Sequence, residues 1–186
     1  MTENSLWDKA KRYLKDSRVP HVLGCESEAV KLAERWGEDT GKASTAALLH
    51  DITKKCSYEE NLELIKKYGL ELDENEMANP KLLHAKTGAA LAADVFNIGP
   101  EIAEAIKWHT TGKPNMTLLE KIIYLADYIE PTRDFDGVEE LRKLAYQDIN
   151  KCMALGLKMS LEEVSSRGTK PHKNTREAFE YYAVAK

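Results

Sequence analysis

The chain has 186 residues, of which 42% are hydrophobic and 31% charged, and its formal net charge at pH 7 is −4. This length and composition predict a folded domain and argue against a disordered chain. The net negative charge disfavours a protein whose main task is to bind a nucleic-acid backbone. The three cysteines have no metal-ligand spacing, and an odd number fits free thiols better than a disulfide framework.

No part of the sequence reaches the roughly eighteen apolar residues that a membrane-spanning helix needs. The N-terminal stretch is charged and amphipathic, without the apolar segment of a secretory signal. We therefore expect a cytoplasmic protein with no membrane partner.

Apolar residues recur every three or four positions along most of the chain, and no comparable stretch alternates with a period of two. The sequence therefore predicts an all-α fold. Capping-box patterns begin at Ser57 and Thr117, Pro20 suits the first turn of a helix, and Gly37 and Gly69 suit helix ends. In chain order, the expected helices cover residues 6–14, 20–36, 42–50, 57–68, 81–96, 100–109, 117–129, 137–167 (which a break could interrupt) and 175–185.

Four of the five histidines, His21, His50, His84 and His109, lie at or near expected helix ends, where side chains from separate helices can meet in one pocket. Asp51 follows His50 directly, after a run of small residues that lets helices approach closely. An imidazole beside a carboxylate offers one nitrogen and one oxygen ligand, a mixed set that suits Fe, Mn, Co or Mg. An exposed His-Asp pair at a helix end is the alternative.

Asp127 lies in a strongly apolar helical stretch. A buried carboxylate is costly unless it is paired or bound to a cation, so a metal or an ion pair with Arg133 or a lysine would each explain it. His109 is followed by two hydroxyls, Thr110 and Thr111, a glycine and a lysine, a mixture that suits phosphate oxygens. A surface helix end with a polar turn would have the same sequence.

Read in order, these residues give the pattern H, HD, H, H, D, which resembles the HD-domain superfamily of helical metal-dependent phosphohydrolases. Residues 84–89, 108–113 and 125–131 look like characteristic segments of the bacterial YqeK family, and the resemblance extends over about residues 9–185. It implies one HD-type domain over residues 1–186, with an HD core at about 18–135 on which helices of residues 137–186 pack.

The resemblance also implies an activity: symmetrical cleavage of diadenosine tetraphosphate into two ADP by a metal-activated water. The primary metal ligands that it implies are His21, His50, Asp51 and Asp127, with iron as the expected ion and Mn, Co or Mg as alternatives. In related two-metal enzymes the positions of His84 and His109 bind a second ion. With one ion, these two histidines would face phosphate, and both arrangements stay open.

We expect Asp51, Asp127, Lys54, His84 and His109 to act in catalysis, with Asp127 orienting or deprotonating the attacking water. Lys54 would lie about one turn from Asp51 if the helix continued, close enough to donate to a phosphate. Arg133 could bind phosphate in bidentate fashion. The alternatives are a solvated lysine and a salt bridge from Arg133 to Asp134 or Asp136.

The loop of residues 169–175 precedes the last expected helix, and helix N-termini favour anions. Lys170, His172, Lys173 and Arg176 form a basic cluster there. We expect this loop to hold a nucleotide phosphate, ribose or base, although a solvated charge cluster would have the same sequence. The expected substrate contacts are His21, Lys54, His84, His109, Thr110, Thr111, Arg133, Lys170, Asn174 and Thr175.

The expected partner is a dinucleoside polyphosphate or another nucleotide, with no nucleic acid, and a homodimer stays open. A 5′-nucleotidase or a deoxynucleoside triphosphate hydrolase would share the metal pattern and is the main alternative. A non-catalytic regulatory HD module is less favoured, because every member of the pattern is present.

Overall fold

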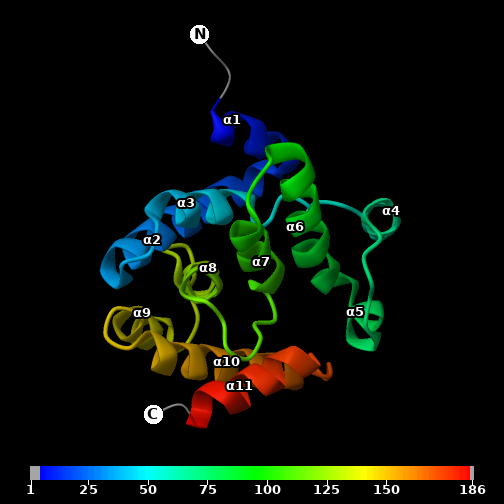
Figure 1. Ribbon diagram of the computed structural model, residues 1–186. Helices are drawn as coiled ribbons and strands as arrows, with labels where there is room; N and C mark the ends of the chain where they lie inside the picture. The colour runs from blue at the N-terminus through cyan, green and yellow to red at the C-terminus, as the bar shows by residue number, and fades with distance from the viewer. Residues whose placement is uncertain (1–4, 185–186) are drawn as a thin grey trace.

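The computed structural model describes residues 5–184 (Figure 1). These residues form eleven α-helices and three short 3-10 helices and contain no strand, so the predicted all-α class is confirmed. The α-helices are α1 (Leu6–Ala10), α2 (Val19–Trp36), α3 (Thr40–Leu49), α4 (Tyr58–Tyr68), α5 (Glu74–Ala78), α6 (Leu83–Phe96), α7 (Pro100–Trp108), α8 (Leu118–Ile129), α9 (Val138–Ala145), α10 (Ile149–Ser166) and α11 (Lys173–Val184). The 3-10 helices are η1 (Lys11–Tyr13), η2 (Asp16–Arg18) and η3 (Pro80–Leu82). Among the described helices, none combines the length and the hydropathy needed to cross a bilayer.

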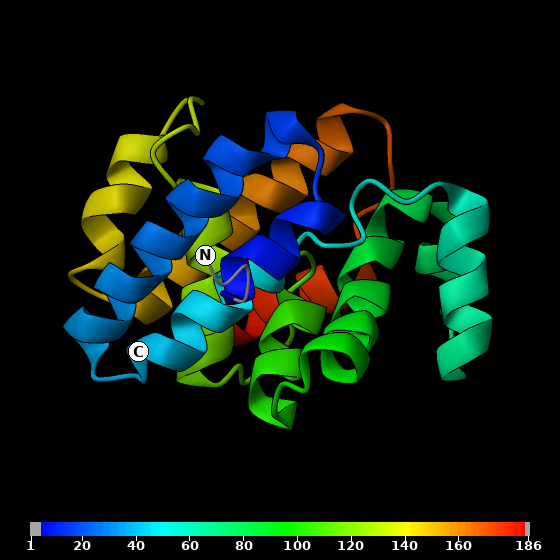
Figure 2. The same ribbon diagram turned by 90° about the horizontal axis from the view of Figure 1, so that it is seen from above.

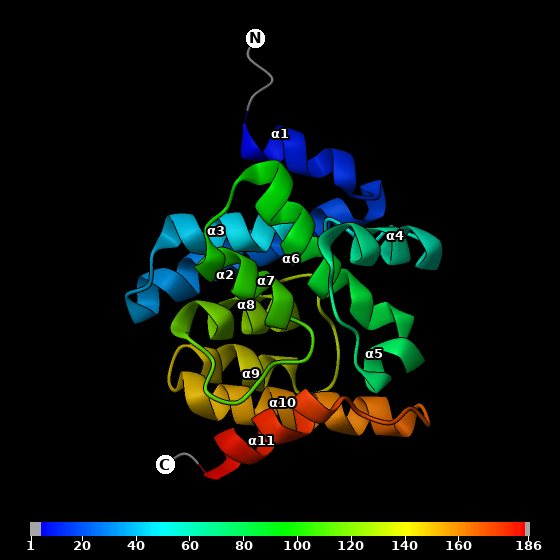
Figure 3. The same cartoon turned by 45° about the vertical axis from the view of Figure 1, so that its right-hand side comes forward.

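Helix α8 lies at the centre of the molecule. Its residues Ile122, Ile123, Leu125 and Ala126 are fully buried. It packs against α2, α3 and α7 on one side and against α9 and α10 on the other, so that it lies between two layers of helices (Figures 1 and 3). A helix that is apolar nearly all round is suited to such a position.

Close approach between α2, α3 and α7 depends on small side chains. Ala43, Ala46 and Ala47 of α3 are all fully buried in the main core. Because alanine projects little beyond the helix backbone, α2 and α7 can pack tightly on α3. This packing fixes the start of α2 and the ends of α3 and α7, which carry three of the histidines. Helices α4 and α5 lie at one side of the molecule (Figure 2).

The local signals set several helix boundaries as expected. Ser57 and Thr117 both form full capping boxes, and Gly37 and Gly69 end α2 and α4 in the left-handed conformation. The three cysteines are free thiols.

Other boundaries differ from the sequence-based expectation. The stretch 6–14 is a short helix followed by a 3-10 turn, and the stretch 137–167 is two helices separated at residues 146–148, where Asp148 caps α10. Helix α5, with its capping box from Asp73 to Glu76, was missed. The last helix begins at Lys173, and the expected end at Ala185 lies outside the described residues.

Candidate metal centre

The first pair of histidines of the centre joins the start of α2 to the end of α3. The Nε2 atom of His21 lies 3.2 Å from Nε2 of His50 and 3.1 Å from Oδ1 of Asp127, in the last turn of α8. Asp51 Oδ2 lies 3.5 Å from His50 Nε2 and 3.8 Å from His21 Nε2. Two imidazole nitrogens and two carboxylates therefore surround one point.

The second pair lies on the other side of Asp51. His84, at the start of α6, and His109, just after α7, have their Nε2 atoms 3.1 Å apart. Asp51 Oδ1 is 3.4 Å from His84 Nε2 and 3.8 Å from His109 Nε2. Its two oxygens thus face the two histidine pairs. Thr110 Oγ1 lies 3.2 Å from His109 Nε2 and adds a hydroxyl to this side.

The orientation of the imidazole rings is set by hydrogen bonds at Nδ1. For three of the rings, the acceptor is the backbone carbonyl three residues earlier, at distances of 2.6 to 2.7 Å: Ala47 for His50, Lys81 for His84 and Ile106 for His109. A carbonyl only accepts, so each neutral ring carries its proton on Nδ1 and presents a lone pair at Nε2. Metal-binding histidines are oriented in this way.

The paired nitrogens show that the donor set fits a cation. Two unprotonated Nε2 atoms about 3 Å apart cannot hydrogen bond to each other, whereas a cation between them can accept both lone pairs. Asp51 is 1% exposed, and its Oδ1 is buried without a hydrogen-bond partner. Candidate ligand atoms of His21, His50 and Asp127, and of His50, Asp51 and His109, lie within 4.8 Å of one another.

The charges of the centre also suit a metal. Burial would raise the pKa of Asp51, but His50, His84 and Lys54 outweigh it and hold the pKa below its ordinary value. The pKa of Asp127 is likewise lowered against the effect of burial. Burial lowers the pKa of His84 and, together with the nearby His50, lowers that of His109 to about 4. At neutral pH the carboxylates are ionised and these two rings neutral, which is the state that binds a divalent metal.

Three cationic side chains surround the centre. Arg18 pairs with Asp51, and Arg133 Nη2 lies 2.6 Å from Asp127 Oδ1. Lys54 Nζ lies 3.0 Å from His84 Nε2 and 3.9 Å from Asp51 Oδ1. The helix does not continue to Lys54, because α3 ends at Leu49 and residues 51–55 form turns, yet the side chain still reaches the centre.

Arg133 pairs with Asp127 and Glu130, so an ion pair of Arg133 with Asp127 is confirmed. The alternative of a salt bridge from Arg133 to Asp134 or Asp136 is wrong. Arg18 was missed, since nothing in the local sequence distinguishes it. Glu130, within the segment 125–131, was also missed, and its buried carboxylate lies 3.0 Å from His21 Nδ1.

A cavity of about 460 Å³ opens beside the centre. Residues of the centre, three aromatic side chains and several acidic residues line it: His109, Thr110, Tyr124, Asp127, Tyr128, Arg133, Phe135, Asp136, Met159, Ser160, Glu162 and Glu163. The rings of Tyr128 and Phe135 have their centroids 5.3 Å apart. This cavity therefore has residues of the centre in one part of its wall and aromatic side chains in another.

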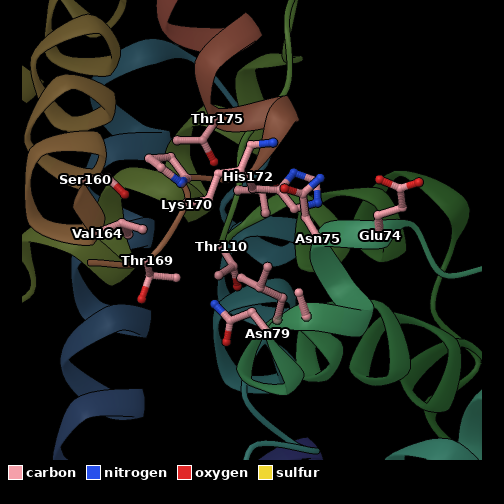
Figure 4. Close-up of a pocket in the computed structure, with 14 residues that line it drawn as sticks. Glu74, Asn75, Asn79, Thr110, Ser160, Val164, Thr169, Lys170, His172 and Thr175 are labelled. Carbon is pink, nitrogen blue, oxygen red and sulfur yellow. The ribbon is translucent and has the colours of Figure 1, made fainter. Parts of the chain in front are cut away.

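A second cavity, of about 310 Å³, shares Thr110 and Ser160 with the first. Lys170 and Thr175 line it, opposite Asn79 (Figure 4), and Thr111 also lies on its wall. Lys170 and Thr175 therefore face this second cavity, and Asn174 lines neither cavity.

His172 is buried near this second cavity, but its hydrogen bonds differ from those of the centre. The Asn174 backbone N–H donates to His172 Nδ1 over 3.1 Å, so the neutral ring carries its proton on Nε2. Nε2 lies 3.0 Å from Asp73 Oδ2 but is buried without a hydrogen-bond partner. Ligand atoms of Asp73, Glu76 and His172 lie within 4.8 Å of one another, and Glu76 accepts from Lys86 and from the Asp73 N–H. We call the His172–Asp73 contact the clasp, because it joins the loop of residues 169–172, just before α11, to α5.

Comparison with known proteins agrees with this geometry. The family model described as HD domain matches residues 18–132, and this chain belongs to the HD-domain family. Within it, the chain belongs to the YqeK family. A relative from Bacillus subtilis, named bis(5′-nucleosyl)-tetraphosphatase, symmetrical, is 43% identical, and the match covers 81% of each chain. A relative of the same name from Staphylococcus aureus is 38% identical over 74% of this chain and 71% of the relative.

A solved structure has the same fold over its whole length. It is the crystal structure of a predicted HD superfamily hydrolase from Clostridium acetobutylicum, described as involved in NAD metabolism. Its TM-score is 0.94 at 42% sequence identity, and the match covers 100% of this chain and 99% of that chain. Family membership and the cluster of histidines and aspartates together indicate a divalent metal site.

Proposed function

We propose that this chain hydrolyses diadenosine tetraphosphate symmetrically to two ADP. The observation that carries the proposal is the arrangement of two Nε2 pairs on either side of the Asp51 carboxylate. The names of the relatives from Bacillus subtilis and Staphylococcus aureus, together with 38–43% identity over most of the chain, support the choice of substrate.

The proposed metal ligands are His21, His50, Asp51 and Asp127, with iron as the ion. When bound, a divalent ion supplies charge neutralisation at the phosphate and a more acidic water. For His84 and His109, a second ion and contact with phosphate both stay open. Their unprotonated Nε2 atoms suit an ion, because a nitrogen lone pair cannot donate to a phosphate oxygen. The ammonium group of Lys54 lies 3.0 Å from His84 Nε2 and already places a positive charge at this pair.

The chain's own residues would share the remaining work. Asp127 contacts both His21 and Arg133, which hold its carboxylate in a fixed position, so it is suited to orienting the attacking water. Arg18, Lys54 and Arg133 would neutralise the phosphate chain, and charge-assisted hydrogen bonds to phosphate are strong. Thr110 would donate its hydroxyl to a phosphate oxygen.

Symmetrical cleavage requires a nucleoside on each side of the reacting phosphates, and a cavity lies on each side of Thr110. In the first cavity, Tyr128 and Phe135 offer faces for stacking with a base. In the second, Thr111, Lys170 and Thr175 offer polar contacts to a ribose or phosphate. We propose that these cavities hold the two halves of the substrate.

The test combines metal analysis of the purified protein with identification of the products formed from diadenosine tetraphosphate. We expect at least one ion per chain and ADP as the sole nucleotide product. ATP with AMP would contradict symmetrical cleavage. Release of a nucleoside and phosphate from mononucleotides, with no action on diadenosine tetraphosphate, would instead support a 5′-nucleotidase.

Lys170 tests the second cavity. Lys170→Ala should raise KM about tenfold with little change in kcat, because it removes one charge-assisted contact to the substrate, worth roughly 1.5 kcal/mol. Lys173→Ala is the matched control, since Lys173 belongs to the same basic cluster but lines neither cavity and pairs with Glu177. Equal kinetics for both variants would remove Lys170 from the substrate contacts.

We also propose that the chain acts as one domain in the cytoplasm. The packing of α10 against α8, α9 and α11 supports the first point, since it joins the C-terminal helices to the helix that carries Asp127. Limited proteolysis should therefore release no stable fragment of residues 18–135.

A further inference from the structure

His21 differs from the other three histidines in how its ring is held. The Nδ1 atoms of those three donate to a carbonyl within their own helical turn. His21 is the third residue of α2, and its Nδ1 instead lies 3.0 Å from Oε1 of Glu130, 109 positions away in the sequence. The direction of the His21 lone pair therefore depends on a single distant side chain.

Glu130 is itself firmly held. It is 0% exposed, and the Thr132 backbone N–H donates to its Oε2 over 2.7 Å, while the Thr132 hydroxyl donates to Oε1. Arg142 of α9 fixes the backbone of the same turn, since its Nη2 donates to the Glu130 carbonyl over 2.8 Å and to the Arg133 carbonyl over 2.9 Å. All the side-chain contacts of Glu130 are donors, as an ionised carboxylate requires.

The sequence of α2 leaves room for this carboxylate. Gly24 lies one turn after His21, and a Cβ atom there would lie 2.6 Å from Glu130 Oε2 and 3.4 Å from Pro131 Cδ. Glycine inside a helix costs about 1 kcal/mol relative to alanine. The backbone of Gly24 is helical, so its conformation would allow any residue. Glycine is required here because a side chain would occupy the space of the Glu130 carboxylate.

We infer that Glu130 is a positioning residue for the proposed metal site, and that Gly24 provides the space it needs. The Glu130 carboxylate accepts the proton of His21 Nδ1, aims Nε2 at the ion and makes that nitrogen a stronger donor. Such outer partners of metal-bound histidines typically change metal affinity by about 10–100-fold. The inference rests on the metal ligands proposed above.

The test measures Mn²⁺ affinity without substrate, from the electron paramagnetic resonance signal of free Mn²⁺, in Glu130→Gln and Gly24→Ala. The matched control is Glu120→Gln: Glu120 is a buried glutamate in the first turn of α8, whereas Glu130 directly follows the last residue of that helix, and Glu120 accepts from the Thr117 N–H. We expect Glu130→Gln and Gly24→Ala to weaken Mn²⁺ binding 10–100-fold, and Glu120→Gln to bind as the unmodified protein does. The thermal stability of each metal-free variant shows whether folding is retained.

A purely structural role for Glu130 predicts something different. Glu130→Gln and Glu120→Gln would then lose thermal stability but retain the same Mn²⁺ affinity, and that result would overturn the inference. If Gly24→Ala does not fold, the two glutamate variants decide alone. Unmodified protein that binds Mn²⁺ but does not cleave diadenosine tetraphosphate would refute the proposed function only, whereas no Mn²⁺ binding at all would refute both.

Discussion

The histidines of the metal centre and the histidine of the clasp are similarly buried but hydrogen-bonded in opposite ways. In the centre, Nδ1 of each ring faces an acceptor, which leaves Nε2 as a lone-pair donor. In the clasp, Nδ1 of His172 is itself the acceptor, and Nε2 carries the proton and lies 3.0 Å from Asp73 Oδ2 without forming a hydrogen bond. Both regions contain three residues whose ligand atoms lie within 4.8 Å of one another: two histidines and one acid in each group of the centre, and His172 with two acids, Asp73 and Glu76, at the clasp. Close ligand atoms are therefore found in both regions. What distinguishes them is the hydrogen-bond partner of Nδ1: an acceptor there leaves Nε2 free to bind a cation, whereas a donor there places the proton on Nε2.

Asp51→Asn tests the centre most severely. The change keeps the shape of the side chain but removes the charge that faces both histidine pairs, so we expect loss of bound metal and a fall in kcat of at least about 10³-fold. Metal analysis and turnover of diadenosine tetraphosphate measure the effect, and circular dichroism should show an unchanged helix content. Asp134→Asn, at an exposed position outside both cavities, is the control. Retention of the metal by Asp51→Asn would contradict the assignment.

The pH dependence of stability tests the neutral state of the rings. The pKa of His109 is about 4 in the folded protein, chiefly because of burial, and about 6.5 in an unfolded chain. Between these values the unfolded chain binds the extra proton, so the free energy of unfolding falls as pH falls from about 6.5 to 4, by on the order of 3 kcal/mol. Urea unfolding of the metal-free protein across this range measures it. His109→Gln should lose clearly less stability over the same interval; an equal loss would show that His109 is not the group responsible.

His172→Leu tests the clasp and should have the smallest effect. It removes the acceptor for the Asn174 N–H and the contact with Asp73, at a cost of about 1 kcal/mol in the free energy of unfolding. KM should rise a few-fold, because the loop that carries Lys170 loses its link to α5. Metal content should not change. A variant that loses metal would mean that the clasp and the centre are not the separate regions described here.

Local signals account for what the sequence predicted well. Ser57 and Thr117 mark their helix starts through contacts within one turn. The histidines and aspartates could be recognised as candidate ligands because they are polar residues within or at the ends of apolar helices. The contacts of Arg18 and Glu130 join residues 33 and 109 positions apart, and no short pattern encodes them. Helix α5 was missed although its Asp-to-Glu capping pattern was present, because a five-residue helix has too few positions to show a period.

The carbonyls that hold His50, His84 and His109 belong to the same helical turns as the rings themselves. These side chains therefore lose their conformational entropy when the backbone folds and not when an ion binds. Preorganisation of this kind strengthens the binding of an ion. An ion that leaves such a pocket can be replaced without any helix having to move.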